Sequence, residues 1–79
     1  MMPLRTLPAQ WKQQALQDLG ARISERRRAL ACKQKELAAA LGLSVEYVSL
    51  IERGGRNPPF TTVVAIAEAL GLPVRDLIA

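Results

Sequence analysis

Histidine is absent from the 79-residue chain, cysteine occurs once, and aromatic side chains make up only 4% of the residues. No apolar run approaches the roughly 18 residues of a membrane span, and the opening MMPLRTLP lacks the apolar centre of a signal peptide. A single cysteine, Cys32, excludes an intrachain disulfide, and the chain offers no obvious metal site or catalytic constellation. We therefore expect a cytoplasmic protein, not an enzyme, that needs no cofactor, metal or membrane.

The positive charge of the chain is concentrated in its middle. The net charge is +4, and residues 22–56 hold eight basic and four acidic side chains, whereas the acids and bases of the flanking segments balance. A basic surface gathered in one segment favours a polyanionic partner such as nucleic acid. Solvated helix faces would explain the same charges, so this distribution alone does not decide the function.

The pattern of apolar and helix-breaking residues predicts an all-α fold. No alternation typical of strands runs long enough for a sheet, and a chain of this length makes one small domain, for which dimerisation is plausible. We expect residues 1–8 to form a poorly ordered N-terminal arm and residues 9–79 to form the domain. Capping residues, glycines and prolines predict helices at about 9–30, 34–41, 44–53, 60–70 and 74–78.

Helical periodicity indicates which side chains these helices bury. In the first helix the apolar stripe bears Arg27 on its edge, where a partly buried arginine requires a carboxylate partner. The stripe consists of Leu16, Leu19, Ile23 and Leu30. The residues expected to be buried by the fourth helix are Phe60, Val63, Val64, Ala67 and Leu70.

The third helix carries a chemically mixed face opposite its apolar side. If Val48 and Ile51 are buried, then at about 100° per residue the exposed side chains are a carboxylate, a hydroxyl, an apolar group and a guanidinium. They belong to Glu46, Ser49, Leu50 and Arg53. These groups match the chemistry that recognises base edges in the major groove of DNA. Many surface helices show such a mixture, so the pattern is weak by itself.

The spacing around this helix is more specific. The stretch QKELAAALGLSVEYVSLIER, residues 34–53, resembles the helix-turn-helix of the Cro and phage-repressor family, also called the XRE family. Its small residue is Ala38, its turn glycine is Gly42, and its buried pair is Val48 and Ile51, which allow two helices to cross closely. The resemblance covers about residues 19–78. It implies a five-helix lambda-repressor-like DNA-binding domain, here with an N-terminally extended first helix.

The resemblance also implies roles for individual residues. Positions that usually meet base edges, or lie beside them, are occupied by Ser44, Val45, Glu46, Ser49 and Leu50. Positions that approach the DNA backbone are occupied by Gln34, Lys35, Tyr47, Arg53, Arg56 and Asn57. A solvated helix end is the alternative for Arg53, and a simple turn is the alternative for Arg56 and Asn57. Arg27 and Glu52 match an arginine–glutamate pair that is structural in the family.

Four positions depart from the family pattern. Lys33 stands where a serine or threonine usually caps the first motif helix, and Ala31 stands where a glycine is usual. Arg26 occupies a position that is more often apolar; we expect its side chain to be solvated or in weak contact with phosphate. Cys32 replaces an aliphatic residue, so we expect a buried, inert thiol rather than a redox sensor. None of these departures lies in the third helix.

The resemblance indicates a sequence-specific transcriptional regulator that acts as a homodimer on an operator in double-stranded DNA. A phage-type repressor, a restriction-modification controller and an antitoxin are all compatible with this domain, and a protein-interaction module is the alternative from another class. The terminal apolar residues predict a dimer contact through the C-terminal region, namely Leu72, Val74, Leu77 and Ile78. Trp11, with Leu4 and Leu7, is expected either to cover a core edge or to join a dimer interface.

Overall fold

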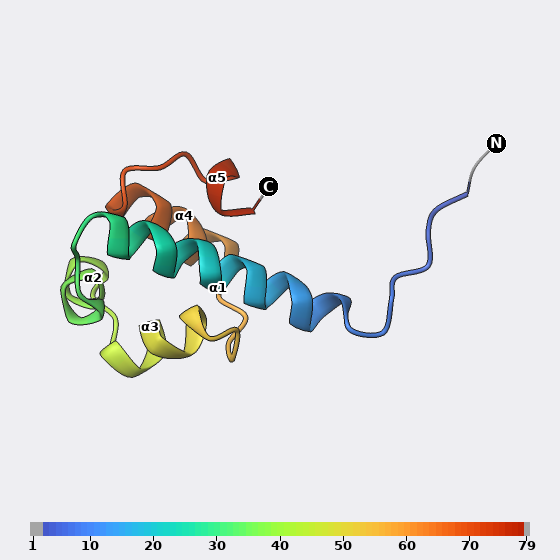
Figure 1. Cartoon of the computed structure of the whole chain (residues 1–79), viewed down its shortest axis with the longest axis horizontal. Helices are drawn as coiled ribbons and strands as arrows, with labels where there is room; N and C mark the ends of the chain where they lie inside the picture. Colours follow the sequence, from blue (N-terminus) through green and yellow to red (C-terminus); the bar gives the residue numbers. More distant parts are fainter. Residues whose placement is uncertain (1–2, 79) are drawn as a thin grey trace.

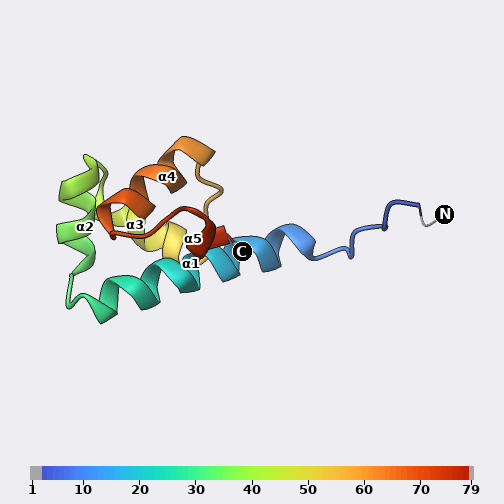
Figure 2. The ribbon, with the colours of Figure 1, turned by 90° about the horizontal axis from the view of Figure 1, so that it is seen from above.

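A computed structural model of the chain describes residues 3–78. The five helices are α1 (Trp11–Ala29), α2 (Gln34–Leu41), α3 (Val45–Glu52), α4 (Phe60–Ala69) and α5 (Arg75–Ile78), and no strand occurs within the described range. The all-α, five-helix prediction is therefore confirmed. Helices α2 to α5 gather around the C-terminal half of α1, while its N-terminal half and residues 3–10 extend away from them (Figures 1 and 2). Predictions for residues 1, 2 and 79 lie outside the described residues.

The core lies where four helices meet the inner face of α1. Val48 and Ile51 are both 2% exposed, as the periodicity of α3 predicted. Together with Ile23 they form one cluster with residues of α2, α4 and α5. The remaining members of this cluster are Leu37, Ala38, Val63, Ile66, Ala67, Leu70 and Leu77. Between residues 3 and 78, no helix combines the length and apolarity that a membrane crossing requires.

Several predictions at helix ends are wrong. The first helix begins at Trp11, because residues 9 and 10 form a turn in which the Trp11 amide donates to the Pro8 carbonyl at 3.1 Å. The helix ends at Ala29, which leaves Leu30 beyond it and 46% exposed. Phe60 is 63% exposed, because it is the first residue of α4 and lies one turn before the buried stripe. Ile66 is buried instead, completing a stripe at spacings of three and four residues.

A glycine allows α1 to approach the end of α3. Gly20 is buried, and a Cβ atom there would overlap the backbone carbonyls of Ile51 and Glu52. Glycine within a helix is less favourable than alanine by about 1 kcal/mol. Its presence here is explained by the close contact, which places the last turn of α3 directly against α1.

The segment between α1 and α2 contains three of the departures from the family pattern. Ala31 adopts a positive φ of 54°, a conformation that glycine accepts more easily. Lys33 provides no side-chain cap for α2, but its own backbone amide donates to Glu36 Oε1 at 2.7 Å. Cys32 is only partly buried, packed against the edge of the core. Glu36 therefore forms its own half of a capping box, and the half that a serine or threonine side chain would form is missing.

Two arginines of α1 bind the C-terminal ends of other helices. Arg26 Nε donates to the Leu70 carbonyl at 3.0 Å, and Arg22 Nη1 donates to the Leu77 carbonyl at 3.5 Å. The last carbonyls of a helix have no partner within the helix and carry partial negative charge, so a guanidinium satisfies both requirements. The expectation that Arg26 is solvated or near phosphate is therefore wrong, because its side chain holds α4 against α1.

Helix α5 is packed against the core more extensively than the sequence indicated. Leu77 is completely buried, and Leu72 and Val74 pack against the core. Ile78 remains 55% exposed. The assignment of Leu77 to a dimer surface is thus corrected, since its side chain is already enclosed within one copy of the chain.

Candidate nucleic-acid interface

The turn between α2 and α3 sets the direction of the third helix. Gly42 ends α2 in the left-handed conformation, with φ of 67°, and the Leu43 amide donates back to the Ala38 carbonyl at 2.9 Å. Ser44 then caps α3, its Oγ accepting from the Tyr47 amide at 3.1 Å. Both residues are typical of the helix ends they occupy. The short turn places α2 and α3 side by side at the end of the molecule farthest from the N-terminus (Figures 1 and 2).

Helix α3 presents a partly open face away from the core. Val45 is 39% exposed and Glu46 is also exposed, whereas Ser49 and Leu50 are half-buried further along the helix. Leu50 is partly covered because the following loop returns beside it, with the Gly55 amide donating to the Leu50 carbonyl at 2.8 Å. The most accessible part of the face is therefore its N-terminal turn, where a negative charge stands beside an apolar side chain.

The remaining predicted contact residues frame this face. Lys35 on α2 and Arg53 at the end of α3 are exposed. Tyr47 is half-buried because its side chain packs against the edge of the core. It therefore has a structural role in addition to the predicted approach to phosphate.

The loop after α3 is fixed at its base and open at its tip. Gly54 is buried with φ of 77°, and an added Cβ would lie only 3.0 Å from Gln17 Cγ. Pro58 is also buried. Arg56 and Asn57 lie between these two anchors and are exposed. The loop therefore presents a cation and an amide to solvent on a segment whose two ends are held by the fold.

A buried ionic network fixes the end of α3. Arg27 binds the Glu52 carboxylate with two hydrogen bonds, Nε to Oε2 at 2.7 Å and Nη2 to Oε1 at 2.9 Å. Gln34 Nε2 also donates to Glu52 Oε1 at 3.0 Å, and Arg27 Nη1 donates to the Cys32 carbonyl at 2.8 Å. The Arg27 and Glu52 side chains are only 10% and 5% exposed. The structure thus brings together the predicted ion pair and joins α1, α2 and α3 at one carboxylate.

This network favours the charged form of both partners. The hydrogen bond with Glu52 raises the pKa of Arg27 despite partial burial. Burial by itself disfavours ionisation of Glu52, but hydrogen bonds from Arg27 and Gln34 outweigh burial and lower the pKa of this carboxyl group. The side-chain amide of Gln34 is therefore engaged in bracing α3, whereas the neighbouring Lys35 is exposed.

The arrangement is suited to a ligand with a groove that can receive an exposed helix. Helix α3 contributes no side chain to the hollows that lie along α1 beside the arm and α5. The candidate surface is instead an exposed helix flanked by cationic and amide groups from α2 and the following loop. A helix of this kind, presented by a short turn from a preceding helix, enters the major groove in helix-turn-helix proteins.

The fold and this surface define a helix-turn-helix DNA-binding domain. The sequence profile described as Helix-turn-helix matches residues 23–77. The chain belongs to this family, within its XRE branch.

Two relatives illustrate the family. An uncharacterized HTH-type transcriptional regulator, y4dJ of Sinorhizobium fredii, is 37% identical over 60 residues, covering 76% of this chain and 78% of the relative. The ImmF control region 10 kDa protein of Bacillus phage phi105 is 41% identical over 59 residues, covering 75% of this chain and 66% of the phage protein. The chain, like the family, belongs to the DNA-binding transcriptional regulators.

Solved structures confirm the architecture. The restriction-modification controller protein C.AhdI from Aeromonas hydrophila superimposes with a TM-score of 0.76 at 37% identity, covering 78% of this chain and 94% of the controller. The hypothetical transcription factor NHTF from Neisseria gives a TM-score of 0.80 at 26% identity, covering 100% of this chain and 87% of that protein. The second match spans the whole chain, so it includes the long first helix as well as the motif.

Proposed function

We propose that the chain regulates transcription by binding an operator as a homodimer, each copy placing α3 in the major groove of one half-site. The observation that carries this proposal is the exposed N-terminal turn of α3, held in place by the Ser44 cap and, at the other end of the helix, by the buried Arg27–Glu52 pair. Such a regulator works in the cytoplasm, alongside the DNA it binds.

The exposed face of α3 is the part that distinguishes one base sequence from another. Glu46 is exposed and carries a negative charge, which is unfavourable next to phosphate unless its carboxylate accepts a hydrogen bond from a base. The amino group of cytosine is the simplest such donor in the major groove. Val45 supplies an apolar contact suited to a thymine methyl group, and Ser44, Ser49 and Leu50 lie at the edges of the same contact.

The cationic and amide groups around α3 bind the DNA backbone. Lys35, Arg53 and Arg56 are exposed on three successive segments, and Asn57 lies beside Arg56 in the loop. Contacts of this kind fix the position of the protein but carry little sequence information. Tyr47 contributes through its hydroxyl group, while Gln34 acts from the start of α2 by bracing Glu52.

Dimerisation follows from the size of the motif. One short recognition helix buries little DNA surface, so two copies supply the affinity and specificity of an operator. The recognition helices then lie roughly 34 Å apart, one turn of DNA. In the C-terminal region, Ile78 is the exposed member of the proposed contact, with Leu72 and Val74 only partly covered.

The test separates base contacts from backbone contacts. Operators are first selected from random DNA, and binding is then measured by fluorescence anisotropy on the operator, its single-base variants and random DNA across a salt series. We expect Glu46→Ala to change the preferred base at one position per half-site. Arg56→Ala should weaken binding to every sequence and reduce the salt dependence by about one unit of slope per copy.

Matched controls remove the same charges elsewhere. Glu68 on α4 and Arg75 on α5 are exposed and lie outside the proposed contact, so Glu68→Ala and Arg75→Ala should leave base preference unchanged. Unchanged base preference in Glu46→Ala together with altered preference in Arg56→Ala would show that the two roles are assigned wrongly. Equal, weak binding of the wild type to operator and random DNA would reject the function itself.

A further inference from the structure

The N-terminal arm, residues 3–10, carries two leucines that its own copy leaves uncovered. Leu4 is 97% exposed and Leu7 is 60% exposed. Figure 1 shows the arm continuing away from the helical body beyond the start of α1. Two large apolar side chains on one short segment are candidates for contact with another surface.

The sequence of the arm places both leucines on one side. Pro3 and Pro8 enclose the segment LRTL, and proline favours the extended polyproline II conformation in itself and in the residue before it. That conformation has three residues per turn and rises about 3.1 Å per residue. In this conformation Leu4 and Leu7, three residues apart, would point the same way at a spacing of roughly 9 Å, and Arg5 would point to another side.

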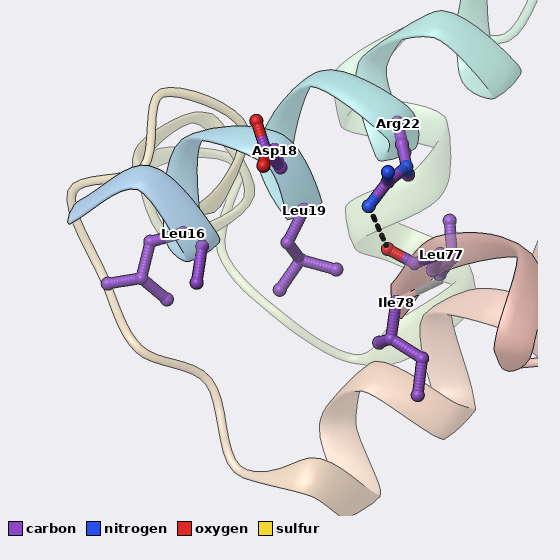
Figure 3. Close-up of a pocket in the computed structure, with 7 residues that line it drawn as sticks. Leu16, Asp18, Leu19, Arg22, Leu77 and Ile78 are labelled. Carbon is purple, nitrogen blue, oxygen red and sulfur yellow. Dashed lines mark hydrogen bonds between the residues drawn. The ribbon is translucent and has the colours of Figure 1, made fainter. Parts of the chain in front are cut away.

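A groove of matching character runs along α1. Its outer part is an open depression of about 420 Å³ lined by Trp11 and Gln14, with Pro8 and Gln10 from the base of the arm. Its inner part is an open depression of about 370 Å³ lined by Leu16, Leu19 and Ile78. Figure 3 shows the three inner side chains around one space between α1 and α5.

The two parts adjoin each other along α1 and share a charged edge. Both are lined by Ala15 and Asp18. Gln14 Nε2 donates to Asp18 Oδ1 at 2.9 Å, so one carboxylate oxygen is already engaged. The negative charge of Asp18 complements the positive charge of Arg5. The groove and the arm are therefore complementary in two respects, because both carry apolar side chains and their charges are opposite.

Building on the homodimer proposed above, we propose that this groove receives the N-terminal arm of a second copy of the chain, with both copies exchanging arms. The Trp11 amide bonded to the Pro8 carbonyl at 3.1 Å fixes the turn from which the arm leaves. Pro8 and Gln10 line the outer end of the groove, but beyond Pro8 the arm runs away from the helical body (Figure 1), and Leu4 and Leu7 do not enter the groove of their own copy. An arm that keeps its direction instead meets a neighbour, and a two-fold axis makes the exchange reciprocal.

The exchange is tested with complementary variants in the absence of DNA. The arm variant is Leu4→Ser/Leu7→Ser, and the groove variant is Ala15→Glu, at an exposed helical position that lines both parts of the groove. Leu30→Ser is the matched control, because Leu30 is 46% exposed and lines neither part. Sedimentation equilibrium measures dimerisation, and the emission of Trp11, the single tryptophan, reports burial of the groove.

We expect the arm and groove variants each to raise the dimer dissociation constant at least tenfold, and the control to match the wild type. Mixing the two defective variants should partly restore dimers, because the intact arm of the groove variant fits the intact groove of the arm variant, which regains one of the two contacts. Trp11 emission should shift to shorter wavelength with concentration in the wild type, the Leu30→Ser control and the mixture, but not in either defective variant alone. Asp18→Arg, at the charged edge shared by both parts of the groove, replaces Ala15→Glu if circular dichroism shows that the latter has lost helix.

Three outcomes overturn the exchange. The arm variant could dimerise like the wild type, or both variants could be monomeric without recovery on mixing. Alternatively, the arm variant could lose stability or DNA affinity with its dissociation constant unchanged, which would place the arm in its own groove or on DNA. The sedimentation and fluorescence measurements contain no DNA, so their results do not depend on operator binding. Only the DNA affinity of the arm variant is measured with DNA. If the wild type bound operator and random DNA equally, the proposed function would be refuted, but the exchange of arms would not.

Discussion

Removing the Glu52 carboxylate should destabilise the fold without altering which DNA bases are preferred. In Glu52→Ala, Arg27 would keep its bond to the Cys32 carbonyl but lose two hydrogen bonds and its counter-charge. Its side chain is only 10% exposed, so water cannot replace the carboxylate without a local opening of the structure. Gln34 would lose its partner at the same time.

The expected loss in the free energy of unfolding is about 3 kcal/mol, at the lower end of the range for removing one member of a buried ion pair. Small domains are stable by only about 5–15 kcal/mol in total. For a domain of this size, such a loss corresponds to a fall in Tm of about 12–24 °C. Glu68→Ala, which removes an exposed carboxylate from α4, should stay within about 0.5 kcal/mol of the wild type.

Urea unfolding followed by circular dichroism measures this loss directly, and a double-mutant cycle assigns it to the pair. Arg27→Met/Glu52→Leu should be at least about 1 kcal/mol more stable than the sum of the single effects implies, because neither charge is left alone. Superimposed urea curves for Glu52→Ala and wild type would refute the reasoning. A strictly additive cycle would show that Glu52 acts through Gln34 or through packing instead of through Arg27.

Three further changes test other parts of the fold. Gly20→Ala should cost about 3 kcal/mol in urea unfolding, since a Cβ would overlap the α3 backbone; a loss below about 0.5 kcal/mol would contradict that contact. Ala31→Gly should raise stability by about 0.5–1 kcal/mol by relieving a positive φ, and a destabilised variant would argue against strain there. In acid, the contribution of Glu52 is present above the unfolded-state pKa of about 4.3 and is lost as the pH falls through its lower folded-state pKa. The stability difference between wild type and Glu52→Gln should therefore narrow below about pH 4, and a difference that widens there would reverse the inferred sign.

The motif was predictable because its signals are local. Val48 and Ile51 are three residues apart on one helix, and Gly42 and Ser44 are the residue types that end and begin helices. Each of these features can be recognised within a few residues, and the structure places all four as expected. The helix boundaries of α2 and α3 follow from the same signals.

The errors concern contacts between segments distant in the sequence. Nothing near Leu77 shows that α5 folds back on α1 and encloses it, and an apolar residue near a terminus is equally typical of an interface. Arg26 follows the pattern of a solvated cation, but the end of α4 lies within its reach. Gly20 did offer a signal, because a glycine inside a long helix usually has a packing reason.

The structure also shows that part of the basic segment, residues 22–56, has a structural role. Arg22, Arg26 and Arg27 all donate to acceptors within the fold, so part of the positive charge counted in the middle of the chain holds helices together. Net charge therefore overstated the cationic surface available to DNA. The exposed cations on α2, at the end of α3 and in the following loop are fewer, but they surround the one helix whose spacing pointed to DNA.

The Glu52 network explains how so small a domain can hold a recognition helix in one orientation. A rotation of α3 by one residue, about 100°, would turn Glu46 toward the core and Val48 toward solvent. At the N-terminal end this rotation is opposed by the Ser44 cap, and at the C-terminal end Glu52 accepts hydrogen bonds from α1 and α2 simultaneously. Because these constraints act at opposite ends of an eight-residue helix, the side chains between them keep a fixed direction before any DNA is bound. The ion pair therefore lies outside the proposed contact surface, and it stabilises the helix that carries this surface.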